Sequence, residues 1–265
     1  MSIMLIRGLK QLLGYRELLV SWALRDIKVR YKQTILGIGW AILQPFVLMV
    51  VFTIVFSKFA RVPSEGNIPY PIFSYCALLP WTFFSNSLSF ATQSIIGNSN
   101  LVRKIYFPRE IFPLAAITAC LVDFGVASTI FIGMMVYYHI SVSSTIVFLP
   151  LILLLQIIFT VAVALVTSAV TVFYRDIRFV VPLGVRVWMY LTPVIYPLSM
   201  VPEKYRTLVM LNPMAGIIDG YRKIILMGQL PDFSSLAYTA AVSLVLFLVS
   251  YAWFKKAEMV FADVI

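Results

Sequence analysis

Six long apolar stretches fill most of this chain, and they restrict its fold more than any other feature of the sequence. They cover residues 35–57, 72–96, 112–138, 146–174, 179–200 and 236–254. The hydrocarbon core of a bilayer is about 30 Å thick and needs about 20 apolar residues in a helix. Because backbone amides in lipid must bond within their own segment, runs of this length predict membrane-spanning helices. The stretch 179–200 fits least well, since it contains Arg186 and three prolines.

The composition supports an integral membrane protein. Hydrophobic residues make up 61% of the 265 residues and charged residues only 12%, whereas soluble domains carry about 25% charged residues. Cys76 and Cys120 both lie inside apolar stretches, which predicts free thiols and gives no indication of a disulfide. We therefore expect an all-α membrane domain of six transmembrane helices over residues 35–254, preceded by a cytoplasmic region (1–34) and followed by a cytoplasmic tail (255–265).

Basic residues are distributed unevenly between the two sides of this six-span arrangement. Fourteen of the 21 fall in the N-terminal region, in the loops after the second and fourth stretches, and in the tail. The positive-inside bias then predicts a multi-pass protein of the cytoplasmic (inner) membrane with both termini in the cytoplasm. The charges are scattered over several loops instead of forming one basic face, so we expect no nucleic-acid partner.

The first 20 residues predict an amphipathic helix. Leucines recur there at helical spacing, and basic residues occupy the positions between them. The segment is too charged to span a membrane, so we expect it to lie along the cytoplasmic headgroups and to contact membrane lipids. A positively charged anchor with no moving role is the alternative.

Two cytoplasmic loops carry features of a docking surface. The loop 97–110 is polar, yet Leu101, Ile105 and Tyr106 can form one face of a short helix within it. We interpret this loop as a surface that binds a soluble partner, and a simple connection is the alternative. The loop 174–179 is a second, smaller candidate.

The segment 201–233 lies on the outer side of the predicted topology. It contains short apolar pieces separated by prolines and glycines. Each piece is too short to span a bilayer, which indicates short re-entrant or lid-like helices. An ordinary packed loop is the alternative.

Residues suited to catalysis are scarce. The chain has one histidine, His139, no Gly-x-x-x-x-Gly-Lys-Ser/Thr phosphate loop and no His-Glu-x-x-His motif. We therefore expect no enzyme activity, no bound metal and no cofactor in this chain. Asp123 and Arg186 are the clearest charges within the apolar stretches. We expect them to pair with each other or to face a channel, because a lone charge in lipid is costly, and a proton relay is the alternative.

Aromatic rings and hydroxyls within the stretches are candidates for a transport path. Rings at the ends of the stretches are typical of the interfacial belt of membrane proteins. Rings and hydroxyls in the middle would also suit a sugar, whereas an ion path would need rings of charges or carbonyls. The candidate path residues are Trp40, Phe46, Phe52, Phe83, Thr160, Thr167, Trp188 and Tyr196.

Several segments together carry a resemblance to a known family. They are RDIKVRYKQTILG at residues 25–37 with the following Trp40, Gln44 and Pro45, then NSNLVRKIYFP at 98–108, YRDIR at 174–178 and NPM at 212–214. Over nearly its whole length the chain resembles the permeases of type-2 ABC exporters for polysaccharides. These include exporters of O-antigen, teichoic acid and capsule.

The resemblance implies an ABC-2 fold of the type V exporter kind. It implies a homodimer, with two separate subunits that bind ATP and Mg²⁺ and drive a lipid-linked polysaccharide through a channel between the halves. The segment 201–233 would form an exit gate. Contact with the ATP-binding subunits is expected from Asn98, Leu101, Arg103, Lys104, Ile105, Tyr106, Phe107, Arg175 and Asp176. The headgroup of the lipid-linked cargo is expected near Arg7, Lys10, Arg25 and Arg30.

Three other functions stay open from the sequence. A permease of the same class for a drug or a lipid would share the architecture, and a closed seam in place of a wide aromatic channel would favour it. An ion-coupled carrier or channel would be excluded if an ATP-binding protein co-purified with the chain. A membrane enzyme without transport activity is disfavoured, because a plausible acid–base set is missing.

Overall fold

The structure, a computed structural model, describes residues 12, 14–65, 68–104 and 107–264. Every regular element within these ranges is a helix, in agreement with the predicted all-α fold. The α-helices are α2 (Arg16–Tyr31), α3 (Gly39–Phe52), α4 (Tyr70–Ser94), α5 (Ser99–Lys104), α6 (Ile111–Tyr137), α7 (Leu149–Phe173), α8 (Ile177–Leu191), α9 (Glu203–Met210), α10 (Pro213–Tyr221), α11 (Phe233–Ala257) and α12 (Phe261–Val264). Two π-helical segments, η1 (Thr53–Phe59) and η5 (Arg222–Leu226), and four 3₁₀ segments, η2 (Ile96–Asn98), η3 (Ser144–Phe148), η4 (Leu198–Met200) and η6 (Glu258–Val260), connect or extend them.

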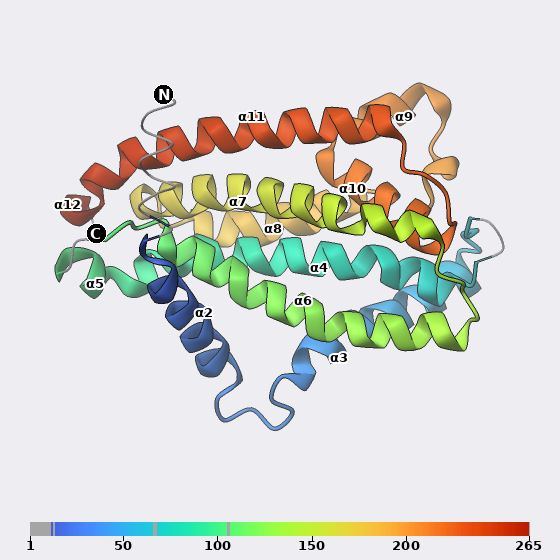
Figure 1. Cartoon of the computed structure of the whole chain (residues 1–265), viewed down its shortest axis with the longest axis horizontal. Helices are drawn as coiled ribbons and strands as arrows, with labels where there is room; N and C mark the ends of the chain where they lie inside the picture. Colours follow the sequence, from blue (N-terminus) through green and yellow to red (C-terminus); the bar gives the residue numbers. More distant parts are fainter. Residues whose placement is uncertain (1–11, 13, 66–67, 105–106, 265) are drawn as a thin grey trace.

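The long helices run side by side along the length of the molecule (Figure 1). Helices α5 and α12 lie at one end, which we call the α5 end, and α9 and α10 lie at the other, the α10 end. Helix α2 leans away from the bundle, and the chain turns back through residues 32–38 into α3. Gly37 in this turn has φ +54°, a backbone conformation that suits glycine.

Helix α4 forms the centre of the bundle. It packs against α3, α6, α7 and α8, and its side chains Phe73, Tyr75 and Phe84 are fully buried. The ring of Phe84 stacks on Phe159 of α7 with centroids 5.6 Å apart and meets Trp188 of α8 edge-on at 5.3 Å. These aromatic contacts join three helices into one apolar core.

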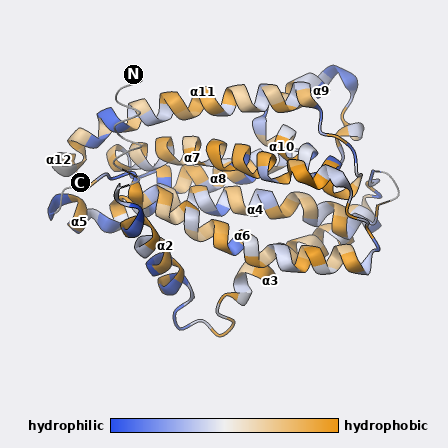
Figure 2. Cartoon of the chain, in the orientation of Figure 1, coloured by the Kyte–Doolittle hydropathy of each residue, from blue (hydrophilic) through white to orange (hydrophobic). Residues whose placement is uncertain are grey.

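Four helices of the described chain are long and apolar enough to cross a membrane. They cover Gly39–Phe59, Ile111–Tyr137, Ser144–Phe173 and Phe233–Val260, which correspond to four of the six predicted stretches. The predicted stretch 72–96 forms the 25-residue helix α4. Figure 2 shows apolar residues along the middle of these helices, whereas hydrophilic residues gather at the ends of the bundle and along α2.

The predicted stretch 179–200, which fits least well because of its prolines, is not one continuous helix. Helix α8 has 15 residues and ends at Leu191. Thr192 is extended, with φ −106° and ψ 140°, because the ring of the following Pro193 disfavours helical backbone at the residue before it. The chain then turns through residues 192–197 into the short segment η4.

Short helices within 201–233 were predicted and are present. Helix α10 is buried along its whole length and packs against α4, α7 and α11. The side chain of Asn212 caps its first turn by accepting a hydrogen bond from the amide of Met214 at 3.1 Å, and Pro213 follows at the first helical position. The N-terminus of α10 is therefore encoded locally by the pair Asn212 and Pro213.

One buried arginine holds the irregular chain after α8 in place. Arg222 is 2% exposed, and its guanidinium donates to the carbonyl oxygens of Pro193 at 2.6 Å and Val194 at 2.7 Å. The same group lies 3.8 Å from the centroid of the Phe73 ring. Backbone carbonyls just beyond the end of a helix have no hydrogen-bond donor within that helix. Arg222 supplies the donors for the carbonyls of Pro193 and Val194.

Candidate functional site

A charged cluster joins the end of α2 to the middle of α6. Arg30 of α2 forms an ion pair with Asp123 of α6, and the hydroxyl of Tyr31 donates to the second Asp123 oxygen at 2.8 Å. The Arg30 guanidinium also lies over the Phe90 ring at 3.8 Å. Burial and the neighbouring Asp123 raise the pKa of Tyr31 to about 12, so its hydroxyl keeps its proton at neutral pH.

The expected pair between Asp123 and Arg186 is therefore wrong. Asp123 is engaged by Arg30 and Tyr31, whereas Arg186 is exposed on α8. The position of Asp123 inside an apolar stretch predicted that it needs a partner. The sequence did not show which helix lies beside it. A residue of the N-terminal region supplies the counter-charge instead.

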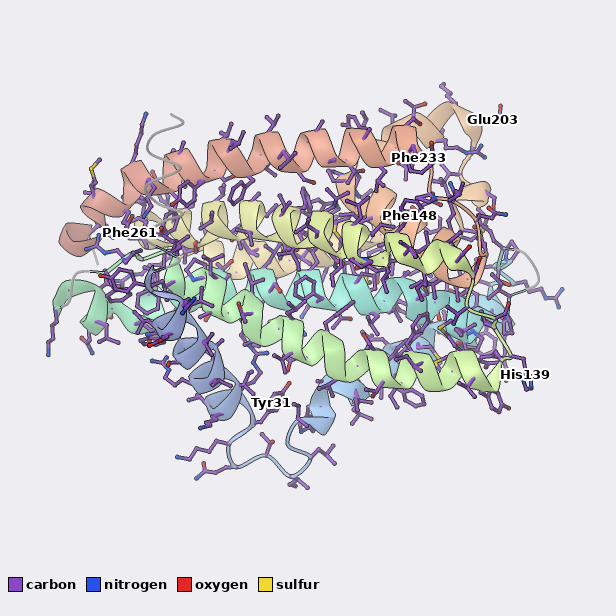
Figure 3. All side chains as sticks on the ribbon, in the orientation of Figure 1. Tyr31, His139, Phe148, Glu203, Phe233 and Phe261 are labelled. Atoms are coloured by element: carbon purple, nitrogen blue, oxygen red, sulfur yellow. The ribbon has the colours of Figure 1, made fainter. Side chains whose placement is uncertain are left out.

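A cavity of about 200 Å³ lies beside this cluster, between α2, α3, α4 and α6. Its wall combines the charged pair with the aromatic rings of Trp40 and Phe83 and with the amide side chains of Gln44 and Asn86. Figure 3 shows Tyr31 at the tip of α2, where the chain turns toward α3. The structure thus brings together two predicted path residues, Trp40 and Phe83, and one predicted headgroup residue, Arg30.

The other predicted path residues do not share this cavity. Phe46 lines a separate groove between α3 and α6. Phe52 is buried against Phe56, and Trp188 belongs to the aromatic core around Phe84.

The remaining hydroxyls of the predicted path bond to nearby backbone. Thr160 is fully buried and donates to the carbonyl of Gln156 at 2.7 Å. Thr167 donates to a carbonyl of its own helix, and Tyr196 donates to the carbonyl of Tyr190 at 3.3 Å. In this conformation these hydroxyls are therefore occupied within the chain.

The predicted docking loop 97–110 contains the short helices η2 and α5. Arg103 and Lys104 of α5 are exposed, whereas Leu101 is half-buried and the neighbouring Val102 is buried. Phe107 is also buried, with its ring 5.2 Å from that of Phe112. The segment therefore presents basic groups outward and keeps Phe107 inside the bundle.

The other predicted docking residues lie in two places. Arg175 and Asp176 of the second loop are exposed. Ile105 and Tyr106 lie outside the described residues, as do Arg7 and Lys10 of the predicted headgroup set.

A hydrogen bond connects α2 to the docking loop. Arg25 of α2 donates to the side-chain oxygen of Asn98 at 3.0 Å, and the Asn98 amide donates to the carbonyl of Ser94 at 2.7 Å. The rings of Trp22 and Phe112 meet edge-on at 5.1 Å on the same side of α2. A predicted headgroup residue and a predicted docking residue are thus direct neighbours.

An ionic network that the sequence did not reveal fixes the other side of the docking loop. Lys255 of α11 contacts Glu110 at 2.6 Å and Glu258 at 3.0 Å. The Tyr251 hydroxyl donates to Glu110 at 3.3 Å, and the Arg109 amide donates to Glu258 at 2.8 Å. Burial and the nearby Glu258 raise the pKa of Glu110, and Lys255 opposes this shift.

No group of three or more potential metal ligands is found in the ranges that the structure describes. Cys76 and Cys120 are buried and unpaired by disulfides, as expected. At the α5 end the leaning helix α2 contacts an exposed basic loop, and the far end of α2 reaches a cavity with charged, amide and aromatic walls.

Comparisons with known proteins identify similar chains. A family profile described as ABC-2 type transporter matches residues 17–226. The chain is 32% identical over 262 residues to the O-antigen export system permease protein RfbA of Myxococcus xanthus, across 98% of this chain and 99% of that protein. It is 31% identical over 260 residues to a protein of the same name from Klebsiella pneumoniae, across 97% and 98%. It is 24% identical over 245 residues to the polysialic acid transport protein KpsM of Escherichia coli, across 89% and 91%.

Proposed function

The chain belongs to the ABC-2 type transporter family, and from this premise we propose that it is the membrane permease of an ATP-driven exporter of lipid-linked polysaccharide, of the O-antigen kind. The observation that carries the proposal is the end-to-end similarity to two permeases named for O-antigen export. Because the similarity covers almost the whole of each chain, it extends to the membrane helices, the loops and both terminal regions.

The proposed arrangement has six spans in the inner membrane and both termini in the cytoplasm. The four long apolar helices would be joined by α4, inside the bundle, and by the shorter α8. The basic residues at the α5 end support a cytoplasmic location of that end. Helices α9 and α10 would then lie at the outer face, where we propose that they form the exit gate.

Two copies of the chain would enclose the polysaccharide channel, and two ATP-binding subunits would bind ATP and Mg²⁺. The exposed Arg103 and Lys104 of α5 and the exposed Arg175 and Asp176 support docking of these subunits at the α5 end. This chain would supply the path, and ATP hydrolysis in the partner would supply the energy.

The contacts at the α5 end suggest how a movement of the docked partner reaches the cavity. A displacement of α5 acts on α2 through the hydrogen bond between Arg25 and Asn98 and through the contact between Trp22 and Phe112. Arg30 and Tyr31 lie on the same helix, at the cavity wall. A tilt of α2 would therefore change the cavity near Trp40, where we propose that the lipid-linked headgroup enters.

The first experiment is an affinity pull-down in detergent with mass spectrometry of protein and lipid. Co-purification of an ATP-binding protein and of a glycan linked to a polyprenyl lipid is the expected result. Uphill transport on an ion gradient by vesicles that contain only this chain would contradict the proposal.

Docking is tested by the combined change Leu101→Asp, Arg103→Glu and Lys104→Glu. We expect the variant to insert into the membrane as the wild type does. Binding of the ATP-binding subunit and export should both be lost, because the changes remove the apolar side chain of Leu101 and reverse the charge of α5. Lys32→Glu, an exposed basic residue outside the loop, is the matched control. Normal assembly in the triple variant would exclude α5 as the docking surface.

A further inference from the structure

A groove between α3–η1 and α6 runs along the half of the bundle nearer the α10 end. We propose that it binds the apolar chain of a polyprenyl phosphate lipid, the carrier of the exported glycan, with the phosphate at Lys58. The proposal rests on the proposed function, because only a lipid-linked cargo brings such a carrier to the transporter. It places the carrier in a groove that one protomer forms by itself.

The groove has the size and the lining of a lipid-chain site. Its volume is about 520 Å³, and its walls include Met49 and Ile54 on one helix and Ile130 and Met134 on the other. Pockets for small molecules range over about 300–1,000 Å³. Both walls belong to helices that are long and apolar enough to cross a membrane, so in the proposed topology the groove lies at the depth of the hydrocarbon core.

The groove offers no free hydroxyl from its two threonines. Thr53 donates to the carbonyl of Met49 at 2.8 Å, and Thr129 donates to the carbonyl of Val126 at 2.7 Å. A sugar would need hydrogen-bonding groups, whereas an apolar chain needs only volume and contact. Apart from Lys58 and the hydroxyls of Tyr137 and Tyr138, the lining therefore favours the lipid part of the cargo over its glycan.

Gly133 of α6 leaves part of this volume empty. A β-carbon at Gly133 would meet no atom of a neighbouring segment within 4 Å. Glycine in a membrane helix commonly permits another helix to approach closely, but no other helix of the described chain comes within 4 Å of this position. Gly133 widens the groove instead.

Lys58 supplies the charge that a lipid phosphate requires. It is exposed in η1 at the end of the groove, and it forms no ion pair with any residue that the structure describes. Tyr137 and Tyr138, whose rings are 5.0 Å apart, line the groove from α6. Tyrosines and a lysine with a long apolar stem are typical of the membrane–water interface.

At the opposite end of the interface between α3 and α6, the basic residue is already paired with an acidic one. The cavity beside Arg30 also lies between α3 and α6, but Arg30 is paired with Asp123. A phosphate is therefore attracted more strongly at the Lys58 end. In the proposed topology this is the outer leaflet, so the groove would hold the carrier after its phosphate has crossed the membrane.

The test measures which lipid the intact transporter retains. The permease with its ATP-binding subunit is reconstituted in vesicles of phosphatidylethanolamine and phosphatidylglycerol doped with undecaprenyl phosphate. Bound lipid is then counted by native mass spectrometry. We expect the wild-type complex to retain undecaprenyl phosphate in preference to phosphatidylglycerol.

Two substitutions and one control address the groove directly. Gly133→Leu fills the groove and is expected to lower retention of undecaprenyl phosphate about tenfold. Lys58→Gln removes the charge and is expected to lower it about fivefold. Gly125→Leu adds the same side chain to α6 outside the groove, where a β-carbon also meets no atom within 4 Å, and is expected to leave retention unchanged.

Several results would overturn the inference. Equal retention of phosphatidylglycerol would make the groove a site for ordinary phospholipid, and unchanged retention in Gly133→Leu would leave it without a lipid. Disulfide cross-links between two copies through Ile54→Cys would place a second copy there. Export of glycan by cells carrying the wild-type chain is measured in parallel. If the wild-type chain exports no glycan, the proposed function is contradicted. If export is normal and Gly133→Leu retains as much undecaprenyl phosphate as the wild type, only the proposed lipid site is contradicted.

Discussion

Each end of the bundle holds a basic side chain that is largely removed from solvent, but the partners of the two side chains differ. At the α5 end, Lys255 contacts the carboxylates of Glu110 and Glu258. At the α10 end, Arg222 donates to backbone carbonyls, including that of Pro193, and burial lowers its pKa to about 10. Arg222 therefore stays charged at neutral pH although its hydrogen-bond partners are dipoles and not anions.

The contact at the α5 end changes with pH, whereas the contact at the α10 end does not. The carboxylates at the α5 end belong to segments far apart in the sequence, and their charge depends on pH. The carbonyls at the α10 end belong to a chain that has just left a helix, and they require donors at any pH. We infer that Arg222 contributes mainly stability to the chain beside the proposed gate, and that the α5 end links the proposed docking loop to α2.

The largest expected effect comes from Arg222→Met. The change leaves the carbonyls of Pro193 and Val194 without donors, and we expect it to lower the free energy of unfolding by about 3–5 kcal/mol. Thermal unfolding in detergent, followed by fluorescence-detected size exclusion, measures the loss. Lys223→Met, next to it and half-exposed in an ion pair with Asp219, should cost less than about 1 kcal/mol. An equal loss of unfolding free energy in both variants would show that the hydrogen bonds of Arg222 to the backbone carbonyls add no particular stability.

Lys255→Met breaks the corresponding contact at the α5 end. It leaves the buried Glu110 without its cation, and we expect a loss of about 2–3 kcal/mol, less than for a fully enclosed pair because Lys255 is partly exposed. The neighbouring Lys256→Met, which is exposed, is the matched control.

The same variant should depend on pH in a defined direction. The pKa of Glu110 is higher in the folded chain than in the unfolded chain, so the folded state takes up a proton as the pH falls. Protonation therefore stabilises Lys255→Met as the pH is lowered from neutral toward 5, and this gain is lost as the pH rises through the folded pKa. Adding Glu110→Gln should abolish the dependence, and its persistence would assign it to another group.

Asp232→Ala should have a smaller effect, confined to the start of α11. The Asp232 carboxylate accepts hydrogen bonds from the amide of Ser234 at 3.1 Å and from its hydroxyl at 2.8 Å. Removing this cap should cost about 1 kcal/mol, and Asp232→Asn should retain most of it. Hydrogen bonds from Ser234 lower the pKa of Asp232, so its contribution is present above the unfolded value and is lost as the pH falls through the folded pKa. Indistinguishable unfolding of the Ala and Asn variants would contradict the capping role.

Arg25→Ala should change stability least and function most clearly. Its hydrogen bond to Asn98 is exposed, so we expect a loss of less than about 1 kcal/mol. If α2 transmits the movement of the docking loop, export should fall while binding of the ATP-binding subunit is retained. Asn98→Ala should reproduce this result, whereas Asn100→Ala, on the exposed side of α5, should not. Normal export in Arg25→Ala would show that the link carries no movement.

Helices were predictable from the sequence where the thickness of the bilayer sets their length. A bilayer of fixed thickness and a backbone that must bond within itself were sufficient to predict helices over 112–138 and 146–174. The same argument was weakest over 179–200, where the prolines counted against a continuous helix, and the structure places the break at Thr192, before Pro193. The short helix α10 was within reach of the sequence, since Asn212 and Pro213 are a local start signal.

The contacts of the candidate site were much less predictable. The link between Glu110 and Lys255 joins residues separated by 145 positions, and nothing local in the sequence specifies it. Asp123 was recognised as a buried charge, but its partner Arg30 lies in a segment that was expected at the membrane surface. Within the docking loop, hydrophobicity could not distinguish the buried Phe107 from side chains that face outward.

The burial of Phe107 also determines how a partner subunit first meets this loop. Its ring is packed against Phe112, so an approaching protein can reach the exposed guanidinium of Arg103 and ammonium of Lys104 but not the Phe107 ring. Such an encounter is guided by long-range attraction, which salt screens over about 8–10 Å at physiological ionic strength. Association should accordingly slow as ionic strength rises, while the lifetime of the assembled complex depends on whether the loop later releases its ring.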